Sequence, residues 1–370
     1  MNTVRRLIHG EALGAITWVL VGFLALFAFF DFVDELGALG APSLTQPGAV
    51  YGVPQALLVV LLWLPARLYE LMPIGVLIGT VYALTRLARD SEFTILRTSG
   101  LGPGLALRQV LLLGLGCAVL TFAIGDYVAP PAARQAQLLK AQYRGNLSIG
   151  STGAWLRERT DGAEVHVVNV RALTPEGELR GVRVLTLSAD GRLQAITEAA
   201  RGTVDRAAGV WRLAEVRRDH WDADGTLRTA TLPTFDWRTG LSADMLNVAL
   251  LKPERMRTLD LWQYMRHLER NDQNAQRYAI EFWRKLLYPL GCVVMVVLAL
   301  PFAYLHFRQQ GLAGYVFAGI MIGISFVLVN GIFSHMGNLL GWAPWLAAGA
   351  TPVLYLALSL AALGWMVLRR

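Results

Sequence analysis

Residues 89–100 read Arg89-Asp90-Ser91-Glu92-Phe93-Thr94-Ile95-Leu96-Arg97-Thr98-Ser99-Gly100, a short polar segment between two long apolar ones. Asp90 or Ser91 can cap the start of a helix, because either side chain accepts hydrogen bonds from exposed backbone N–H groups. Glu92 then lies in the first turn, where its charge complements the positive end of the helix dipole. Gly100 supplies the left-handed residue that commonly ends a helix. The segment therefore predicts a single short helix at about residues 90–100.

The predicted helix is suited to contact with another protein. Phe93 and Leu96 are three residues apart and share one face. With roughly two to three turns, the helix is too short to be stable alone and cannot cross a membrane. A short helix held at a membrane face by a spanning helix on each side is well placed to receive force from a partner. The alternative interpretation is an ordinary solvated loop.

The composition is that of a membrane protein. Of 370 residues, 54% are hydrophobic and 16% charged, with a mean hydropathy of +0.42, whereas soluble domains carry about 25% charged residues. The net charge is +7, but the basic clusters lie beside apolar runs, which favours topology signals over a nucleic-acid surface. Cys117 and Cys292 lie in apolar runs without metal-ligand spacing, so we expect neither a metal site nor a disulfide framework.

Apolar runs predict six membrane-spanning helices, three on each side of a polar insert. Each run has the roughly 20 residues that a bilayer crossing needs. The second is longer and is interrupted by Pro65, Arg67, Glu70 and Pro73, so we expect its outer third to project, bend or lie in the interface. The third is expected to stop at Pro130-Pro131. The six runs are residues 12–30, 55–87, 105–128, 279–304, 312–333 and 344–368.

The polar insert, residues 132–258, has the pattern of an all-β domain. Residues 165–170, 182–187 and 210–213 show the short alternating runs of strands. Dipeptides such as Asp190-Gly191 are typical of the turns that separate strands. An insert of this length can bury its own core, and many short strands suit a sandwich or a jelly roll.

Charges in the short loops predict the orientation of the chain. The loops 35–53 and 336–344 contain neither Lys nor Arg. Arginines gather on the other side, at Arg5, Arg6, Arg86, Arg89, Arg97, Arg108, Arg308, Arg369 and Arg370. The positive-inside rule then places both termini and the short helix in the cytoplasm and the β insert outside. The predicted domains are residues 1–131 with three spans, 132–258 with the external β domain, and 259–370 with a connecting helix and three spans.

No catalytic motif is present in the sequence. The three lysines, Lys140, Lys252 and Lys285, do not follow a glycine, so the chain has no P-loop for ATP. H-E-x-x-H, C-x-x-C and G-x-S-x-G are absent. A membrane enzyme would need a nucleophile–base pair or a metal site, and we find neither in the sequence. A secondary transporter would need a second broken helix to match the second span, and the sequence shows none. A cell-envelope scaffold with an external β domain remains an alternative.

Charged residues within the apolar runs are candidates for function, because a charge at the bilayer centre costs roughly 2.5–3.5 kcal/mol. Arg67 and Glu70 are three apart and can pair with each other. Arg67 also lies near the outer interface, as judged by its distance from Arg86, and there it can either snorkel into the interface or meet an anionic headgroup. Glu281 and Lys285 are four apart and are expected to form a pair within one helix.

Several short motifs are spread along the chain. They are Phe32-Val33-Asp34, Pro65-Ala66-Arg67, Met72-Pro73, Arg89-Asp90-Ser91-Glu92 with Ser99-Gly100, and Lys285-Leu286-Leu287-Tyr288-Pro289-Leu290. With three spans on each side of a β domain, these motifs resemble the LptF/LptG family of lipopolysaccharide export permeases over essentially the whole chain. Phe-Val-Asp and the residues of the second span are more similar to LptG than to LptF.

The resemblance implies the permease subunit of an ABC-type exporter without a nucleotide site, cofactor or nucleic-acid partner. Such proteins pair as an LptF–LptG heterodimer on two copies of the cytoplasmic ATPase LptB. They extract lipopolysaccharide from the bacterial inner membrane and pass it, through a jelly-roll-like periplasmic domain, to a bridge that begins with LptC. An LptF-type subunit is the alternative within the family.

The resemblance also assigns residues to two sites. Glu92 matches the acidic position of the family's coupling helix, which sits in a groove of the ATPase. The predicted ATPase contacts are Ser91, Glu92, Phe93 and Leu96. Arg67 matches a basic position implicated in contact with lipopolysaccharide phosphates, and Lys285 is the second candidate for substrate contact.

The end of the first span departs from the family pattern. Familiar enterobacterial LptG chains carry lysines there, where this chain has Asp31, Gly37 and Ala38. Part of an anion site is therefore absent. Three explanations stay open: Arg67 and residues of the partner do more, divalent cations bridge acid to phosphate, or the charge of the substrate differs.

Overall fold

The protein consists of membrane helices with an antiparallel sheet inserted between them, as the sequence predicts. The computed structural model describes residues 2–43, 50–90, 92, 95, 98, 100, 102–144, 154–159, 164–173, 178–188, 190–205, 210–222, 225–240, 253–271, 273–304 and 312–368. Two compact units result. A helical unit comprises Met1–Asp34, Val60–Ala132 and Gln276–Arg370, and a second unit, which holds the sheet, comprises Glu35–Val59 and Ala133–Ala275.

The helices follow the apolar runs of the sequence. Their bounds are α1 Asn2–Leu36, α2 Val53–Arg89, α4 Pro103–Ala123, α5 Ala129–Arg144, α7 Thr258–Arg270, α8 Gln276–Leu287, α9 Leu290–Ala299, α10 Leu312–Leu340 and α11 Pro344–Leu368. Within the described residues, five stretches of helix are each long and apolar enough to cross a membrane. The sixth crossing is the pair α8 and α9 with the 3-10 turn Leu300–Tyr304, bent by 49°.

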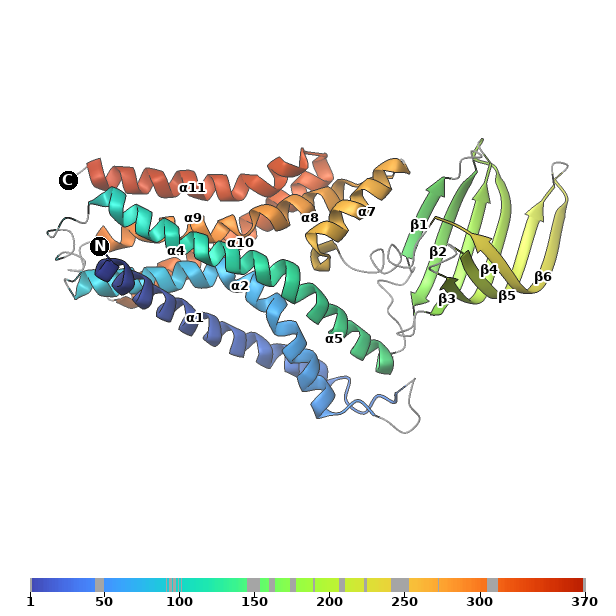
Figure 1. Ribbon diagram of the computed structural model, residues 1–370, viewed down its shortest axis with the longest axis horizontal. Helices are drawn as coiled ribbons and strands as arrows, with labels where there is room; N and C mark the ends of the chain where they lie inside the picture. The colour runs from blue at the N-terminus through green and yellow to red at the C-terminus, as the bar shows by residue number, and fades with distance from the viewer. Residues whose placement is uncertain are drawn as a thin grey trace. The chain divides into compact units, whose positions relative to one another are not determined.

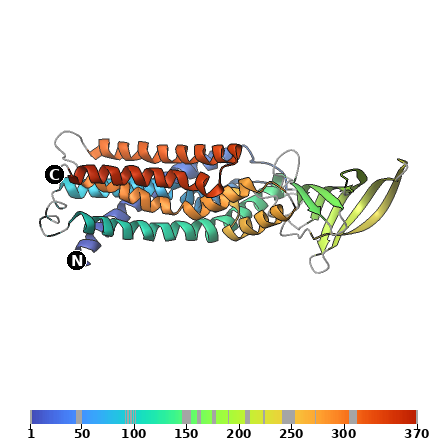
Figure 2. The same ribbon diagram turned by 90° about the horizontal axis from the view of Figure 1, so that it is seen from above.

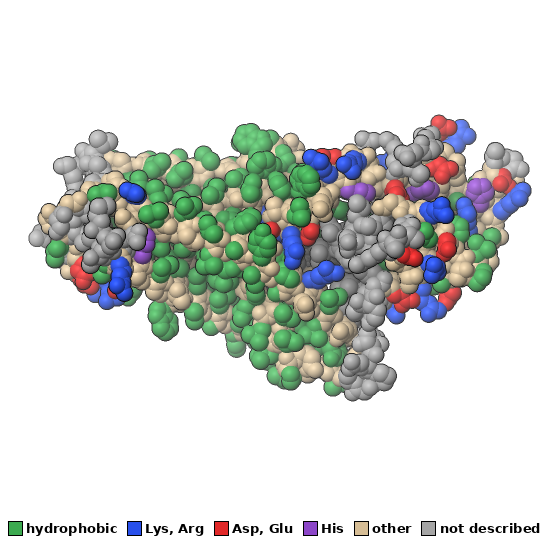
Figure 3. All heavy atoms as spheres, in the orientation of Figure 1, with side chains coloured by type: hydrophobic (Ala, Val, Ile, Leu, Met, Phe, Trp, Pro, Cys, Tyr) green, Lys and Arg blue, Asp and Glu red, His purple; other side chains and the backbone are tan. Residues whose placement is uncertain are grey.

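The helical unit has both ends of the chain at one of its ends and an apolar surface. Figures 1 and 2 show the start of α1, the end of α2, the start of α4 and the end of α11 at the same end of this unit. Figure 3 shows hydrophobic side chains covering most of the visible helix surface, whereas charged side chains are frequent over the strands. The buried core of the unit includes Met72, Leu77 and Phe326, and α4 packs along α9 while α11 packs on α8, α9 and α10.

The third span does not stop at Pro130-Pro131, contrary to the prediction. Residues Ile124–Val128 form a π-helical turn, which joins α4 to α5 without a break. The N–H of Ala129 donates to the carbonyl of Ile124, five residues back. Pro130 and Pro131 follow directly, in the first turn of α5, where a missing N–H costs little. π turns of this kind are typically single turns within α-helices. The helix therefore continues to Arg144.

The broken span is the fourth rather than the second. α2 is a continuous helix through Pro65 and Pro73. That its outer third projects, bends or lies in the interface stays a prediction. The predicted fourth span, residues 279–304, instead divides at Tyr288-Pro289. Pro289 is the N-cap of α9, a position where a missing N–H costs little.

α1 and α2 approach most closely where α2 has glycines. A Cβ atom on Gly79 would lie 2.5 Å from Ile16 Cα, and one on Gly75 would lie 2.4 Å from Leu20 Cδ2. Ile16 and Leu20 are buried, together with Ile8 on the same face of α1. Small residues are what allow two membrane helices to come this close.

Gly79→Ala is therefore expected to destabilise the protein, by about 1–3 kcal/mol, because the added methyl group overlaps the backbone of α1. The measurement is the unfolding temperature in detergent. Gly116→Ala is the matched control, since a Cβ there meets no atom within 4 Å. Removing a helical glycine normally stabilises by roughly 0.5–1 kcal/mol, so the two variants should shift the temperature in opposite directions. Equal shifts would contradict this account of the α1–α2 contact.

The inserted sheet has six antiparallel strands in sequential order. They are β1 Ala154–Arg159, β2 Val165–Leu173, β3 Glu178–Leu187, β4 Leu193–Asp205, β5 Val210–Trp221 and β6 Leu227–Arg238. The strands predicted at 165–170, 182–187 and 210–213 are confirmed as parts of β2, β3 and β5. The Asp190-Gly191 turn is also confirmed, with Gly191 at φ +76° and its N–H bonded to Ser188.

A line of irregular positions, here called the crease, crosses the sheet from β2 to β6. Four successive strand pairings skip one position, and the skipped residues lie on a line: Arg171, Gly181, Ala200, Glu215 and Pro233. Gly181 has φ +62° and Glu215 has φ +55°, and a proline has no N–H for the ladder. Along each of β3, β4 and β5, buried residues alternate with less buried ones, and this alternation shifts by one residue at the crease. In β3, burial steps from Leu179 to Val182 and then Val184.

Candidate functional site

Arg67 lies in α2 and is held by an acid from α1. Its Nε donates to Asp31 Oδ2 at 3.0 Å and its Nη2 to Asp31 Oδ1 at 2.7 Å, a two-point contact that fits the planar guanidinium. Nη1 lies 3.4 Å from Glu70 Oε2, one turn further along α2. The guanidinium carbon is 5.5 Å from the centre of the Phe27 ring. One cation and two acids leave this group with a formal charge of −1.

The sequence predicted the Arg67–Glu70 contact but not the stronger contact with Asp31. The sequence signal that could have indicated the Asp31 contact is a matched spacing of charges in two antiparallel spans. Glu11 and Asp31 are 20 residues apart in α1, and Arg86 and Arg67 are 19 apart in α2. Arg86 Nη1 indeed lies 3.1 Å from Glu11 Oε2, so ion pairs join the two helices at both levels.

The turn of α2 that carries Arg67 is fixed on its other side by aromatic residues. A Cβ on Gly125, in the π turn of the third span, would lie 2.4 Å from the Tyr69 ring. The Tyr69 and Tyr288 rings are 4.9 Å apart, and the Tyr288 hydroxyl donates to the carbonyl of Glu70 at 2.7 Å. The π turn and the bend of the fourth span thus serve to position α2 at Arg67.

A second charged group is buried between the third and fourth spans. Lys285 Nζ lies 3.8 Å from Asp126 Oδ1, and Arg284 Nη2 lies 2.9 Å from Glu281 Oε2. The side chains of Lys285, Asp126 and Glu281 are only 8%, 12% and 10% exposed. These are partners that the spacing of Glu281 and Lys285 did not predict. Two acids and two bases balance, as buried charges must. A substrate phosphate would compete with Asp126 for Lys285, so that substrate role stays a prediction.

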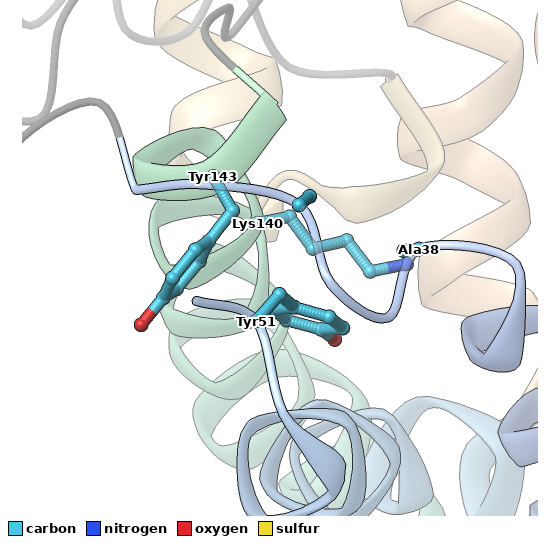
Figure 4. Close-up of a pocket in the computed structure, with 5 residues that line it drawn as sticks. Ala38, Tyr51, Lys140 and Tyr143 are labelled. Atoms are coloured by element: carbon cyan, nitrogen blue, oxygen red, sulfur yellow. The ribbon is translucent and has the colours of Figure 1, made fainter. Parts of the chain in front are cut away.

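A third group anchors the connection between α1 and α2 within the second unit. Glu35 is 5% exposed, accepts a hydrogen bond from the Tyr51 hydroxyl at 3.0 Å and pairs with Lys140 of α5. Figure 4 shows Lys140 reaching toward the backbone at Ala38, with Tyr51 and Tyr143 beside it. The pocket that these side chains line has no space for a water molecule. We therefore assign it a structural role.

The predicted coupling segment is described at five positions, Asp90, Glu92, Ile95, Thr98 and Gly100. Glu92 and Ile95 are helical and exposed, Ile95 by 61%. The Thr98 hydroxyl donates to the carbonyl of Ile95 at 2.9 Å, and Gly100 has φ +104°, the left-handed conformation expected of a residue that ends a helix. Ser91, Phe93 and Leu96, the other predicted ATPase contacts, lie outside the described residues.

Fold and site together define a class of protein. Apolar helices cross a membrane six times, if the bent pair counts as one crossing, and a sheet is inserted after the third. No group of three or more metal-ligating side chains occurs in the part of the chain that the structure describes. Several charges pair between spans: Arg67 with Asp31, Arg86 with Glu11 and Lys285 with Asp126. These are the features of a polytopic membrane protein with a large inserted β domain.

Comparison with known proteins identifies the family. The profile described as "Lipopolysaccharide export system permease LptF/LptG" matches residues 6–368, so the chain belongs to this family of transport subunits. The chain is 27% identical to the lipopolysaccharide export system permease protein LptG of Escherichia coli K12 over 349 residues, which cover 94% of this chain and 92% of the relative. It is 27% identical to the LptG of Haemophilus influenzae over 343 residues, 92% of each. The resemblance read from the sequence is confirmed.

Proposed function

We propose that this chain is the LptG-type permease subunit of an ABC-type lipopolysaccharide exporter in the bacterial inner membrane. It extracts lipopolysaccharide from that membrane and passes it to a periplasmic bridge, with the energy supplied by a separate ATPase. The observation that carries this proposal is the match to the permease family over nearly the whole chain, together with a β domain inserted between two sets of membrane helices.

The proposed partners are an LptF-like six-span subunit, an LptB-like cytoplasmic ATPase dimer and an LptC-like protein that begins the bridge. Among the five single-helix spans, α1 and α10 bury the least of their apolar windows, 11% and 17%. Phe29 of α1 and Phe317 and Leu328 of α10 are all more than 60% exposed. An LptF-like subunit packed on these surfaces would complete a transport path. The sequence has no P-loop, in agreement with an ATPase on another chain.

We place both termini and the coupling segment in the cytoplasm and the β domain in the periplasm. The support is the positive-inside rule. Arg5 and Arg6 lie in the first turns of α1, and Arg86 and Arg89 in the last turn of α2. Figure 1 shows these two helix ends at the end of the helical unit where the chain begins and ends. For the same function we assign Arg67 and Lys285 to substrate contact and Ser91, Glu92, Phe93 and Leu96 to the ATPase contact. Arg67 is 34% exposed and so within reach of a lipid headgroup.

The test is coexpression with LptF-like and LptB-like proteins, followed by purification through a tag on this chain. We expect all three to copurify, and lipopolysaccharide to stimulate ATP hydrolysis by the complex. A scaffold protein would not retain the ATPase. An LptF-type subunit would assemble with an LptG-like partner in place of an LptF-like one. Either result would replace the proposed assignment.

The role of the β domain is tested by photocrosslinking. Val182 and Val184 of β3 are buried on one face of the sheet, whereas Arg183 between them is exposed and pairs with Glu198 at 2.6 Å. If the domain hands lipid onward through its apolar face, crosslinkers at Val182 and Val184 should capture lipopolysaccharide only when ATP is present. A crosslinker at Arg183 is the control. Capture at Arg183 alone, or at none of the three, would favour a scaffold.

A further inference from the structure

We propose that Asp31 is a built-in competitor for the anion site at Arg67, and that it restricts the site to lipids with phosphomonoester groups. The inference rests on the proposed substrate contact of Arg67. It concerns the specificity of that contact, which an arginine alone would not provide.

The geometry makes Asp31 a stand-in for a bound anion. Its two carboxylate oxygens lie 3.0 and 2.7 Å from Nε and Nη2, the two-point contact that a phosphate would make. The third nitrogen, Nη1, lies toward Glu70, whose side chain is 62% exposed. A lipid anion can therefore approach Arg67 from the exposed side, but it gains the two-point contact only when Asp31 leaves.

Asp31 can leave Arg67 by rotation of its own side chain, because it stands in the less buried outer half of α1. The buried residues of this helix within the helical unit are Ile8, Ala12, Ile16 and Leu20, and the positions from 21 to 34 are all partly or fully exposed. An added Cβ at Gly75 or Gly79 of α2 would come closest to Leu20 or Ile16 of this inner half. Phe23, Leu24 and Phe27 still pack against the core, so the carboxylate leaves by side-chain rotation and the helix end stays in place.

The charge of the incoming anion decides the competition. A phosphodiester headgroup carries one negative charge, as does the carboxylate that it must replace, and Glu70 repels it. A phosphomonoester carries about −1.5 to −2 at pH 7 and has three acceptor oxygens, so its attraction to the guanidinium is larger. Phosphodiesters are the commonest anions on a bilayer surface. An arginine without a paired carboxylate would bind them, whereas Arg67 paired with Asp31 excludes them. Competition against the wrong ligand is a general source of specificity.

The experiment measures lipid binding to the purified protein by native mass spectrometry. The probes are phosphatidic acid, a phosphomonoester, and phosphatidylglycerol, a phosphodiester. We expect the wild type to prefer phosphatidic acid at least about fivefold, the range of a partly exposed ion pair. Asp31→Asn should bind phosphatidylglycerol more tightly and lose most of the preference. Asp31→Glu keeps the competing charge and should keep the preference.

Two further variants separate this inference from the proposed contact. Asp34→Asn removes an exposed acid that makes no ion pair within the described residues, and it should behave as the wild type. Arg67→Gln should lose the preference, and binding of phosphatidic acid should fall. If Arg67→Gln loses binding but Asp31→Asn keeps the wild-type preference, the substrate contact stands and the competitor role is wrong. If Arg67→Gln changes nothing, both are overturned. If the wild type shows no preference but Arg67→Gln loses binding, the substrate contact stands and the competitor role is wrong.

Discussion

Arg67→Glu is expected to lower crosslinking of lipopolysaccharide near the outer end of α2 by about 10- to 100-fold, and to stop most export. A hydrogen bond to a charged group contributes about 1.5–3 kcal/mol, and the substitution replaces attraction to phosphate with repulsion. It also gathers three acids, at positions 31, 67 and 70, where the structure has a bidentate pair. The measurements are ATP-dependent crosslinking from a photoreactive residue at the exposed Leu61 and lipopolysaccharide at the cell surface.

Two variants show whether the loss arises at the substrate. Arg86→Glu breaks the other α1–α2 ion pair, with Glu11 at 3.1 Å, and so disturbs the helix contact without touching the proposed site. Its lipid crosslinking should stay close to that of the wild type. Arg67→Lys keeps the charge but not the planar fork, and should recover part of the crosslinking. Normal export by Arg67→Glu at a normal protein level would remove Arg67 from the site.

Leu96→Asp is expected to abolish assembly with the ATPase, and Glu92→Ala to weaken it or to uncouple ATP hydrolysis from export. Glu92 is exposed in the isolated chain, so it is available to a basic group on a partner. Loss of one member of a buried charge pair costs about 3–5 kcal/mol, against less than about 1 for an exposed pair. The effect therefore requires a largely dry interface, and an unpaired aspartate at position 96 of such an interface should cost more than a truncation.

The readouts are copurification of the ATPase and lipopolysaccharide-stimulated ATP hydrolysis. Thr98→Ala is the control, since that hydroxyl bonds to the carbonyl of Ile95 within the same segment. A charge reversal at Glu92, combined with one at its basic partner, should restore part of the coupling. If Glu92→Ala and Leu96→Asp both bind the ATPase and couple normally, the segment is only a connecting loop.

Much of the architecture could be read from the sequence because it depends on local patterns. The length of an apolar run decides whether it crosses a membrane, so the three-plus-three arrangement was predictable. Alternation over a few residues decides a half-buried strand, as at 165–170 in β2. The end of the coupling segment at Gly100 and the helix after the insert, α7, follow from similarly short signals. Arg67 as a charge to be explained was evident for the same reason.

Only the tertiary structure decided which charges meet. Arg67 binds Asp31, 36 residues away, and Lys285 lies beside Asp126 on another span. Such pairs depend on the register of two packed helices, which neither helix specifies alone. The same holds for the third span, because a π turn positioned against Tyr69 allows the helix to pass Pro130-Pro131.

The crease in the sheet is a second feature that local pattern could not give. Alternation assumes that side chains point to opposite faces at every step. At Gly181 and Glu215 the backbone has positive φ, and the buried positions shift by one residue at the same line across β3, β4 and β5. The break is aligned across neighbouring strands, so it is a property of the assembled sheet. A single strand shows only a break in its own alternation. The pairing with its hydrogen-bonded neighbours shows that these breaks are aligned.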